Sequence, residues 1–422
     1  IQAISVAGRI YRSLERFPEA AEIFQQAWDQ KRVILGERHL ETMVAVHDLA
    51  TIYRGQGRYA EAEPLLVQVK ETTRSEMGES HPSTSQAMTS LAALYLLEDR
   101  PDVAERLLKE SMTLLAAIVP EDHPMVGDTK HHLGVAYRDR GQFTDADRLL
   151  REAYDALVAS VGKEHPRTLV LRANRALLIQ AQGEPGQAAS QLRELLTMQP
   201  RVLGDKHTYT LLTKVRLAAA LAQQQKFEEA LALCTDGVLG FQQKFGDSHP
   251  LTLKCRANLG RILHAVGEPQ QAIEQFDKVL DAYQDRLLQG ETWVHLRLGE
   301  MLAQKANVLL QQGQPVEAQQ IVTDAIEMLK QHAEPGWRLT EAQAVLTRTL
   351  VAQGKLTEAE PRLLAVVANW EETADQIPQP HRDAIGTHAC TQLVELYTAQ
   401  GQQDAAARWR DRLADLQAEG HQ

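Results

Sequence analysis

Six histidines stand at a constant interval of 42 residues, and histidine is the side chain most often used to bind metals and move protons. They are His39, His81, His123, His165, His207 and His249. One histidine per unit places successive rings roughly 10 Å or more apart, since packed helices lie about 8–10 Å from one another. A zinc ion needs several ligands at about 2 Å. We therefore predict that these histidines shape the connections between units and that no metal or cofactor is bound.

Asp128, His131 and His132 form a denser cluster of polar side chains. Asp128 and His132 are one helical turn apart, so they can share a face of a helix. A metal site or a pH-sensitive contact is one interpretation. Because no third ligand stands nearby in the sequence, we favour a solvated or peptide-facing pair.

Motifs for catalysis are missing from the sequence. It contains no G-x-x-x-x-G-K, H-E-x-x-H or G-x-S-x-G, and no strand followed by G-x-G-x-x-G. The three cysteines, Cys234, Cys255 and Cys390, have no C-x-x-C spacing, which argues against a zinc knuckle or a disulfide framework. On apolar helices we interpret Cys234 and Cys255 as buried small side chains. We predict a chain that is not an enzyme and that resides in the reducing cytoplasm.

The elements that carry these residues follow from the spacing of apolar side chains. Val46, Leu49, Ala50 and Tyr53 fall at i, i+3, i+4 and i+7, and the same pattern resumes at Ala62 after a break. Each unit is therefore predicted to contain two amphipathic helices. The turn between them carries a glycine, for which a left-handed backbone is accessible. This turn glycine recurs as Gly57, Gly141, Gly183, Gly267, Gly313, Gly354 and Gly401.

Two further markers keep the same phase. The linker G-x-x-H-P-x-T joins one helix pair to the next, and its proline is predicted to begin the following helix. A recurrent alanine is predicted to mark the closest approach of the two helices of a pair. It stands at Ala20, Ala62, Ala104, Ala146, Ala188, Ala230 and Ala272. Two markers in phase indicate one duplicated unit.

Composition narrows the classes of partner. The chain has 422 residues, is 44% apolar and carries a net charge of −11, which disfavours nonspecific binding to nucleic acid or to an anionic membrane. No apolar run approaches the roughly 20 residues that span a bilayer. The sequence begins at Ile1 without the features of a signal peptide, and we expect further residues upstream in the gene.

The segment Leu49-Ala50-x-x-Tyr53-x-x-x-Gly57-x-Tyr59-x-Glu61-Ala62 resembles the tetratricopeptide repeat, in its 42-residue kinesin-light-chain-like variety. The resemblance implies an all-α fold, a right-handed superhelical solenoid of about ten helix-turn-helix repeats. Residues 1–285 would form seven regular repeats, and residues 286–422 three degenerate repeats with a C-terminal capping helix. The closing segment from Gln392 to Leu413 is similar to the last repeat of arrays attached to bacterial serine/threonine kinases and signalling NTPases.

The same resemblance implies that first helices line a concave groove that holds the ligand. Asparagine can bind a peptide main chain through its donor and its acceptor, and arginine can bind a carboxylate or phosphate with two donors. We therefore predict a groove for an extended or helical peptide of acidic character. The alternative, that these polar side chains are only solvated, stays open. The predicted groove residues are His132, Asn174, Arg216, Lys254, Asn258 and Arg261.

These observations predict a noncatalytic protein-protein interaction scaffold that binds a peptide or protein segment and belongs to a bacterial signalling protein. The alternative is a regulatory or ligand-sensing module that controls an attached or associated kinase, NTPase or protease. We expect a protein or peptide partner, no nucleic acid and no membrane, and a monomer or a weak homodimer formed through terminal repeats.

Overall fold

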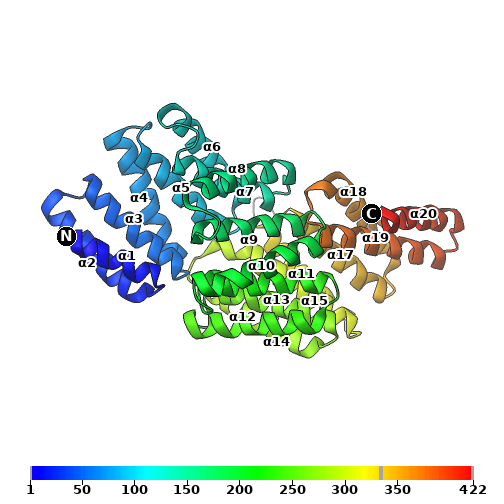
Figure 1. Ribbon diagram of the computed structural model, residues 1–422. Coiled ribbons are helices and arrows are strands. Elements are labelled where there is room, and N and C mark those ends of the chain that lie inside the picture. Colours follow the sequence, from blue (N-terminus) through cyan, green and yellow to red (C-terminus); the bar gives the residue numbers. More distant parts are fainter. Residues whose placement is uncertain (1, 332–335, 420–422) are drawn as a thin grey trace. The chain divides into compact units, whose positions relative to one another are not determined.

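The computed structural model describes residues 2–331 and 336–419, and it is built from helices (Figure 1). In these residues there are twenty α-helices, two short 3₁₀ segments, Thr292–Val294 and Ala374–Gln376, and no strand. The α-helices follow one another as antiparallel neighbours joined by short turns. The predicted all-α fold of about ten helix-turn-helix repeats is thereby confirmed.

Each repeat contributes a first and a second helix. The first helices are α1 (Gln2–Ser13), α3 (Leu40–Gly55), α5 (Pro82–Leu97), α7 (Pro124–Asp139), α9 (Pro166–Ala181), α11 (Thr208–Gln223), α13 (Pro250–Val266), α15 (His295–Gln311), α17 (Trp337–Ala352) and α19 (Gln379–Ala399). The second helices are α2 (Phe17–Leu35), α4 (Tyr59–Met77), α6 (Pro101–Ile118), α8 (Phe143–Val161), α10 (Pro185–Val202), α12 (Phe227–Phe245), α14 (Pro269–Leu288), α16 (Pro315–Lys330), α18 (Leu356–Thr373) and α20 (Gln403–Glu419).

The chain divides into two compact units. Unit 1 comprises Ile1–Leu178, Arg193–Thr213 and Phe241–Leu251, and unit 2 comprises Ile179–Leu192, Lys214–Gly240 and Thr252–Gln422. Within each unit, consecutive first helices touch, as α5 touches α7 in unit 1 and α15 touches α17 in unit 2. The division predicted near residue 285 marks the end of the regular repeats, whereas these two units are defined by their internal contacts. The predicted division therefore stays a prediction.

The marker alanines belong to the core between the helices of each repeat. All seven are completely buried, as are the equivalent Ala318, Ala359 and Ala406 of the later repeats. A methyl group is the largest side chain that such a position admits without displacing its neighbours. Larger apolar side chains, among them Phe24 in unit 1 and Phe276 in unit 2, fill the space on either side. The pattern of small and large residues therefore fixes the register of each pair.

The turn inside each repeat needs a left-handed residue. The predicted turn glycines all have a positive φ, for example 73° at Gly57 and 91° at Gly267. Three repeats lack the glycine, and Glu15, Asp99 and Gln225 adopt the same conformation with φ between 54° and 59°. A residue with a β-carbon is strained there by roughly 1 kcal/mol. The geometry of the turn is thus imposed by the packing of the two helices.

The recurrent histidine caps the first helix of the next repeat. In all six linkers its Nδ1 accepts a hydrogen bond from the backbone N–H two residues on, at 3.2–3.3 Å. In four linkers the threonine hydroxyl also donates to the glycine carbonyl six residues earlier, at 2.8–3.0 Å. These bonds satisfy groups that helix ends leave unpaired. The linker histidines therefore set the direction of the first helices.

Candidate functional site

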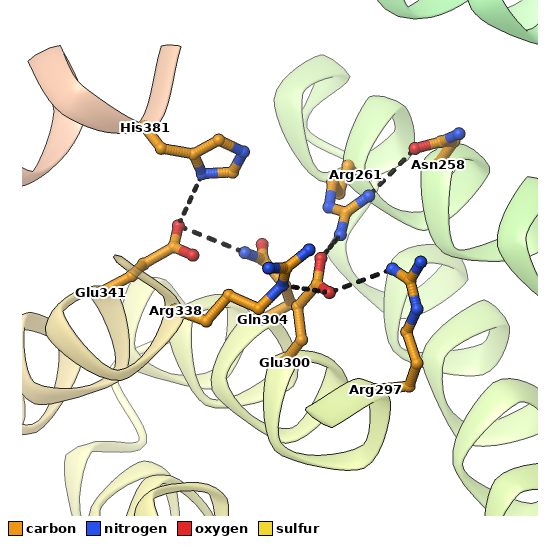
Figure 2. A network of polar contacts seen from close by, with 8 residues as sticks. All are labelled: Asn258, Arg261, Arg297, Glu300, Gln304, Arg338, Glu341 and His381. Carbon is orange, nitrogen blue, oxygen red and sulfur yellow. Dashed lines mark hydrogen bonds and ion pairs between the residues drawn. The ribbon is translucent and has the colours of Figure 1, made fainter. Parts of the chain in front are cut away.

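A polar network occupies the first helices of unit 2, with Glu300 of α15 at its centre (Figure 2). Arg338 of α17 donates from Nε to Glu300 Oε2 at 3.1 Å, and Arg297 donates from Nη1 to the same oxygen at 3.3 Å. Arg261 of α13 forms an ion pair with the other oxygen, Oε1. Three successive first helices thus direct guanidinium groups toward one carboxylate.

Glu300 is charged although it is buried, with a side chain only 5% exposed. Burial on its own would raise the pKa of Glu300, because a low-dielectric environment disfavours the charged form. The charges of Arg338, Arg261 and Arg297 outweigh burial and hold the pKa well below its usual range. The carboxylate is therefore an anion at neutral pH and acts as a fixed counterion for the surrounding cations.

A second carboxylate, Glu341 of α17, extends the network toward α19. Its Oε1 accepts from Gln304 Nε2 at 3.4 Å and lies 3.3 Å from Nδ1 of His381 (Figure 2). Burial acts to raise the pKa of Glu341, but the charge and hydrogen bond of His381, together with the charge of Arg261, hold it below its ordinary value. The His381 ring also lies on Trp337, with ring centroids 4.0 Å apart. A flat aromatic and imidazole surface therefore borders the charged groups.

Arg348 stands on the same helix, two turns beyond Glu341. Its Nη1 donates to the amide oxygen of Asn307 at 2.6 Å, and no carboxylate of the described residues lies within ion-pair distance of it. Burial lowers the pKa of Arg348. Arg261 and Arg338 share Glu300, and Arg348 has only a neutral partner, so this face of unit 2 carries more positive than negative charge.

The structure places four of the predicted groove residues in unit 2. Arg261 and Asn258 belong to the network, where Arg261 Nη1 donates to Asn258 Oδ1 at 2.9 Å (Figure 2). Lys254 is exposed and Arg216 half-buried, and both charges act on the thiol of Cys255. The role of these four residues in binding stays a prediction.

The other two predicted groove residues lie in unit 1. Asn174 is 9% exposed, and its Nδ2 donates to Nε2 of His131 at 2.7 Å. His132 is half-buried, and its Nδ1 donates to the carbonyl oxygen of Asp128 at 2.8 Å. The Asp128 carboxylate itself forms an ion pair with Arg167. The structure therefore separates the acidic side chain from the two imidazoles that the sequence grouped with it.

Sequence reasoning missed the residues that complete the network: Arg297, Glu300, Gln304, Arg338, Glu341, Arg348 and His381. A signal for them exists in the turn glycines. Glu300 and Glu341 each precede a turn glycine, Gly313 and Gly354, by 13 residues, as Lys254 precedes Gly267. Counting back from the turn glycines therefore identifies the groove positions in the later repeats. The interval of 42 residues does not, because the repeat length changes between residues 285 and 295.

The described residues do not meet the requirements of a metal site, a reactive cysteine or a membrane-spanning helix. No three of their histidine, cysteine, aspartate or glutamate side chains come together in a way that could hold a metal ion. All three cysteines are buried, and burial raises the pKa of the Cys234 thiol to about 12, so that it is protonated at neutral pH. Within the same residues, no helix combines the length and apolar character that crossing a bilayer requires.

Solved structures with a similar course of the chain are known. A Rap protein complexed with Competence and Sporulation Factor is 11% identical, with a TM-score of 0.65 over 90% of this chain and 99% of that one. The apo form of RapI is 10% identical, with a TM-score of 0.53 over 89% and 98%. At these identities the likeness concerns the fold alone.

A solved structure of kinesin-light-chain-like repeats also matches part of the chain. TPR-like repeats of a Podosopora anserina protein described as a kinesin light chain are 26% identical over 48% of this chain and 95% of that one, with a TM-score of 0.37. No curated protein sequence matches the chain. The family model described as tetratricopeptide repeat matches residues 2–75, 42–117, 125–201 and 209–285, which together cover more than half of the sequence. The chain therefore belongs to the tetratricopeptide repeat family.

Proposed function

We propose that the protein is a noncatalytic scaffold whose first helices in unit 2 bind an acidic segment of a partner protein. Membership of the tetratricopeptide repeat family supports a protein-protein interaction scaffold. The acidic character of the ligand rests on one observation: the first helices of unit 2 present four arginines, Arg261, Arg297, Arg338 and Arg348, but only two carboxylates, Glu300 and Glu341.

This local charge runs against the charge of the whole chain. The sequence has 56 acidic and 45 basic residues, so an excess of arginine at one place is not a by-product of composition. Glu300 neutralises only part of that excess. A glutamate or aspartate of a bound segment would supply the missing counterion, and the planar guanidinium of Arg348 can donate two parallel hydrogen bonds to it. The amides of Asn258 and Asn307 offer partners for a peptide main chain.

The experiment uses two fluorescein-labelled 12-residue peptides, one rich in glutamate and the other with glutamine at the same positions. Fluorescence anisotropy of the full chain gives both dissociation constants at low salt. We expect the glutamate peptide to bind at least about tenfold more tightly, which corresponds to about 1.4 kcal/mol. Arg348→Gln should remove most of this preference.

Arg362→Gln is the matched control, because Arg362 is exposed on the second helix α18 and the substitution removes the same charge. It should leave both dissociation constants unchanged. Equal binding of the two peptides, or equal losses in the two variants, would show that charge in this network does not select the ligand. The pair Arg216→Glu and Lys254→Glu tests in the same assay whether the binding surface extends to α11 and α13.

We propose further that the scaffold acts in the cytoplasm as part of a bacterial signalling protein. The similarity of residues 392–413 to the closing repeat of kinase-linked arrays supports this placement. In that setting the array would position a kinase, NTPase or protease relative to its partner. Sequencing the gene upstream of Ile1 tests the proposal: a kinase or NTPase domain in the same reading frame supports it, and a start codon directly before Ile1 contradicts it.

A further inference from the structure

Arg12 and Arg54 of unit 1 stand at equivalent positions of the first two repeats and have different partners. Arg12 of α1 donates from Nη1 to the carboxylate of Asp48 at 3.2 Å. The residues one repeat later are Arg54 and Ser90, and Arg54 Nη1 donates to the backbone oxygen of Ser90 at 3.4 Å. The same arginine position therefore reaches the same position of the next first helix in both cases. Only the first of the two arginines finds a carboxylate there.

Arg54 has no anionic partner in the described part of the chain. The one hydrogen bond that its guanidinium donates is the long contact to the Ser90 backbone oxygen, and no carboxylate lies within ion-pair distance of it. Burial lowers the pKa of Arg54, and the charge of Arg12 acts in the same direction. The acidic groups that act on Arg54 are the phenols of Tyr209 and Tyr59, which are uncharged at neutral pH. Arg54 is half-buried, and a guanidinium that is partly withdrawn from water and lacks a counterion is destabilised until an anion reaches it.

One imidazole borders the same place, and the charge of Arg54 acts on a second. His47, two turns before Arg54 on α3, lies with Nε2 2.8 Å from the Ser90 hydroxyl, so that Arg54 and His47 meet at one residue. On α7, His132 uses Nδ1 to donate to a carbonyl, and in its neutral form Nε2 is therefore the unprotonated nitrogen. Burial, with the charge of Arg54 as a further cause, lowers the pKa of both rings to about 4.

We propose that Arg54, with His47 beside it, is a binding subsite for one oxyanion of a ligand, a carboxylate or a phosphate group, which occupies the place that Asp48 fills for Arg12. The guanidinium supplies the charge and a pair of parallel donors. The Ser90 side chain is uncharged, so it does not repel the ligand as a carboxylate would. This subsite lies in unit 1 and does not depend on the acidic segment proposed for unit 2.

Ser90→Asp is the most informative variant, because it restores the carboxylate that the preceding repeat has. Thermal unfolding of the full chain at pH 7 is measured in sodium phosphate, sodium acetate and sodium chloride at one ionic strength. An anion that binds only the folded protein raises the midpoint. We expect phosphate or acetate to raise the midpoint of the wild type above its value in chloride, and the more effective anion identifies the ligand group.

Ser90→Asp should raise the midpoint in chloride and reduce the response to the added anion by at least about half, because its own carboxylate occupies the site. Arg54→Gln should reduce the response similarly and provides the test if Ser90→Asp does not fold. Arg58→Gln, which removes an exposed arginine near Arg54, should keep the full response. An unresponsive wild type, or equal responses in the wild type, Ser90→Asp and Arg54→Gln, would overturn the proposal.

Discussion

Arg54 in unit 1 and the arginines around Glu300 in unit 2 hold positive charge on the first helices in opposite ways. In unit 2 the chain provides its own carboxylate, which three guanidinium groups surround. In unit 1 the position that could provide a carboxylate for Arg54 is a serine. A charge compensated inside the fold contributes mainly to order and rigidity, whereas an uncompensated charge is available for a ligand.

The comparison also explains why repeats of one fold can differ in what they bind. The helix pairs and turns keep one layout through the seven regular repeats. The residues nine and three positions before the turn glycine, such as Asp48 and Arg54, differ between repeats, so a single substitution creates or removes an ion pair. In this fold, specificity can therefore change without a change in packing.

The largest expected effect is the loss of the carboxylate in unit 2. Glu300→Gln leaves Arg261, Arg297 and Arg338 close together without their shared counterion. Removing one partner of a buried ion pair costs roughly 3–5 kcal/mol, and we expect the free energy of unfolding to fall by that amount in urea titrations. Glu327→Gln is the control, because Glu327 is exposed on α16, and it should change stability by less than about 0.5 kcal/mol. Similar losses in both variants would mean that the network does not depend on Glu300.

A smaller effect is expected from pH in unit 1. The pKa of His47 and of His132 is about 4 in the folded protein, below the ordinary value of 6.5. Below pH 6.5 the unfolded chain therefore binds protons that the folded chain does not, and stability falls as pH decreases from 6.5 toward 4. Urea titrations at pH 7, 6 and 5 should show this loss.

The double variant His47→Gln and His132→Gln isolates the contribution of the two rings. It should reduce the dependence of the unfolding free energy on pH, while His39→Gln, at the exposed linker position, should not. If the double variant keeps the full dependence, the two rings are already protonated or freely solvated in the folded state, and the contrast between the units is weaker than we infer.

The smallest expected effect comes from exchanging the partners of Arg12 and Arg54. Asp48→Ser alone should destabilise the protein by about 1 kcal/mol or less, since Arg12 is 40% exposed and water screens the pair. Adding Ser90→Asp should recover most of this loss and should move the response to anions from Arg54 to Arg12. If stability and anion response do not change together, the two repeats are not equivalent at this position.

Much of the fold is encoded locally and could be predicted. The spacing of apolar residues, the turn glycines and the marker alanines specify the helix pairs without knowledge of distant contacts. The sequence predicted that the linker histidine shapes the connection between repeats, but not the hydrogen bond that its Nδ1 accepts. Histidine is not among the usual N-cap residues, and the bond to Nδ1 depends on an extended backbone at the histidine, which His39 adopts although leucine and not proline follows it.

The candidate site was predictable only in part, because its residues come together across repeats. Asn258 and Arg261 were identified within the regular repeats. Their partners in α15, α17 and α19 follow a change in repeat length, where a fixed interval of 42 residues no longer aligns the positions. The absence of a carboxylate near Arg54 is likewise visible only once α3, α5 and α7 are placed side by side.

The central claim is that uncompensated arginines on the first helices select an acidic ligand, and a charge exchange tests it most directly. Fluorescence anisotropy of wild type and Arg348→Glu is measured with the glutamate peptide and with a lysine peptide of the same length, after circular dichroism confirms that both proteins are folded. The account predicts a crossover, with weaker binding of the glutamate peptide and tighter binding of the lysine peptide by Arg348→Glu. Unchanged affinities, or affinities that change in the same direction for both peptides, would contradict it.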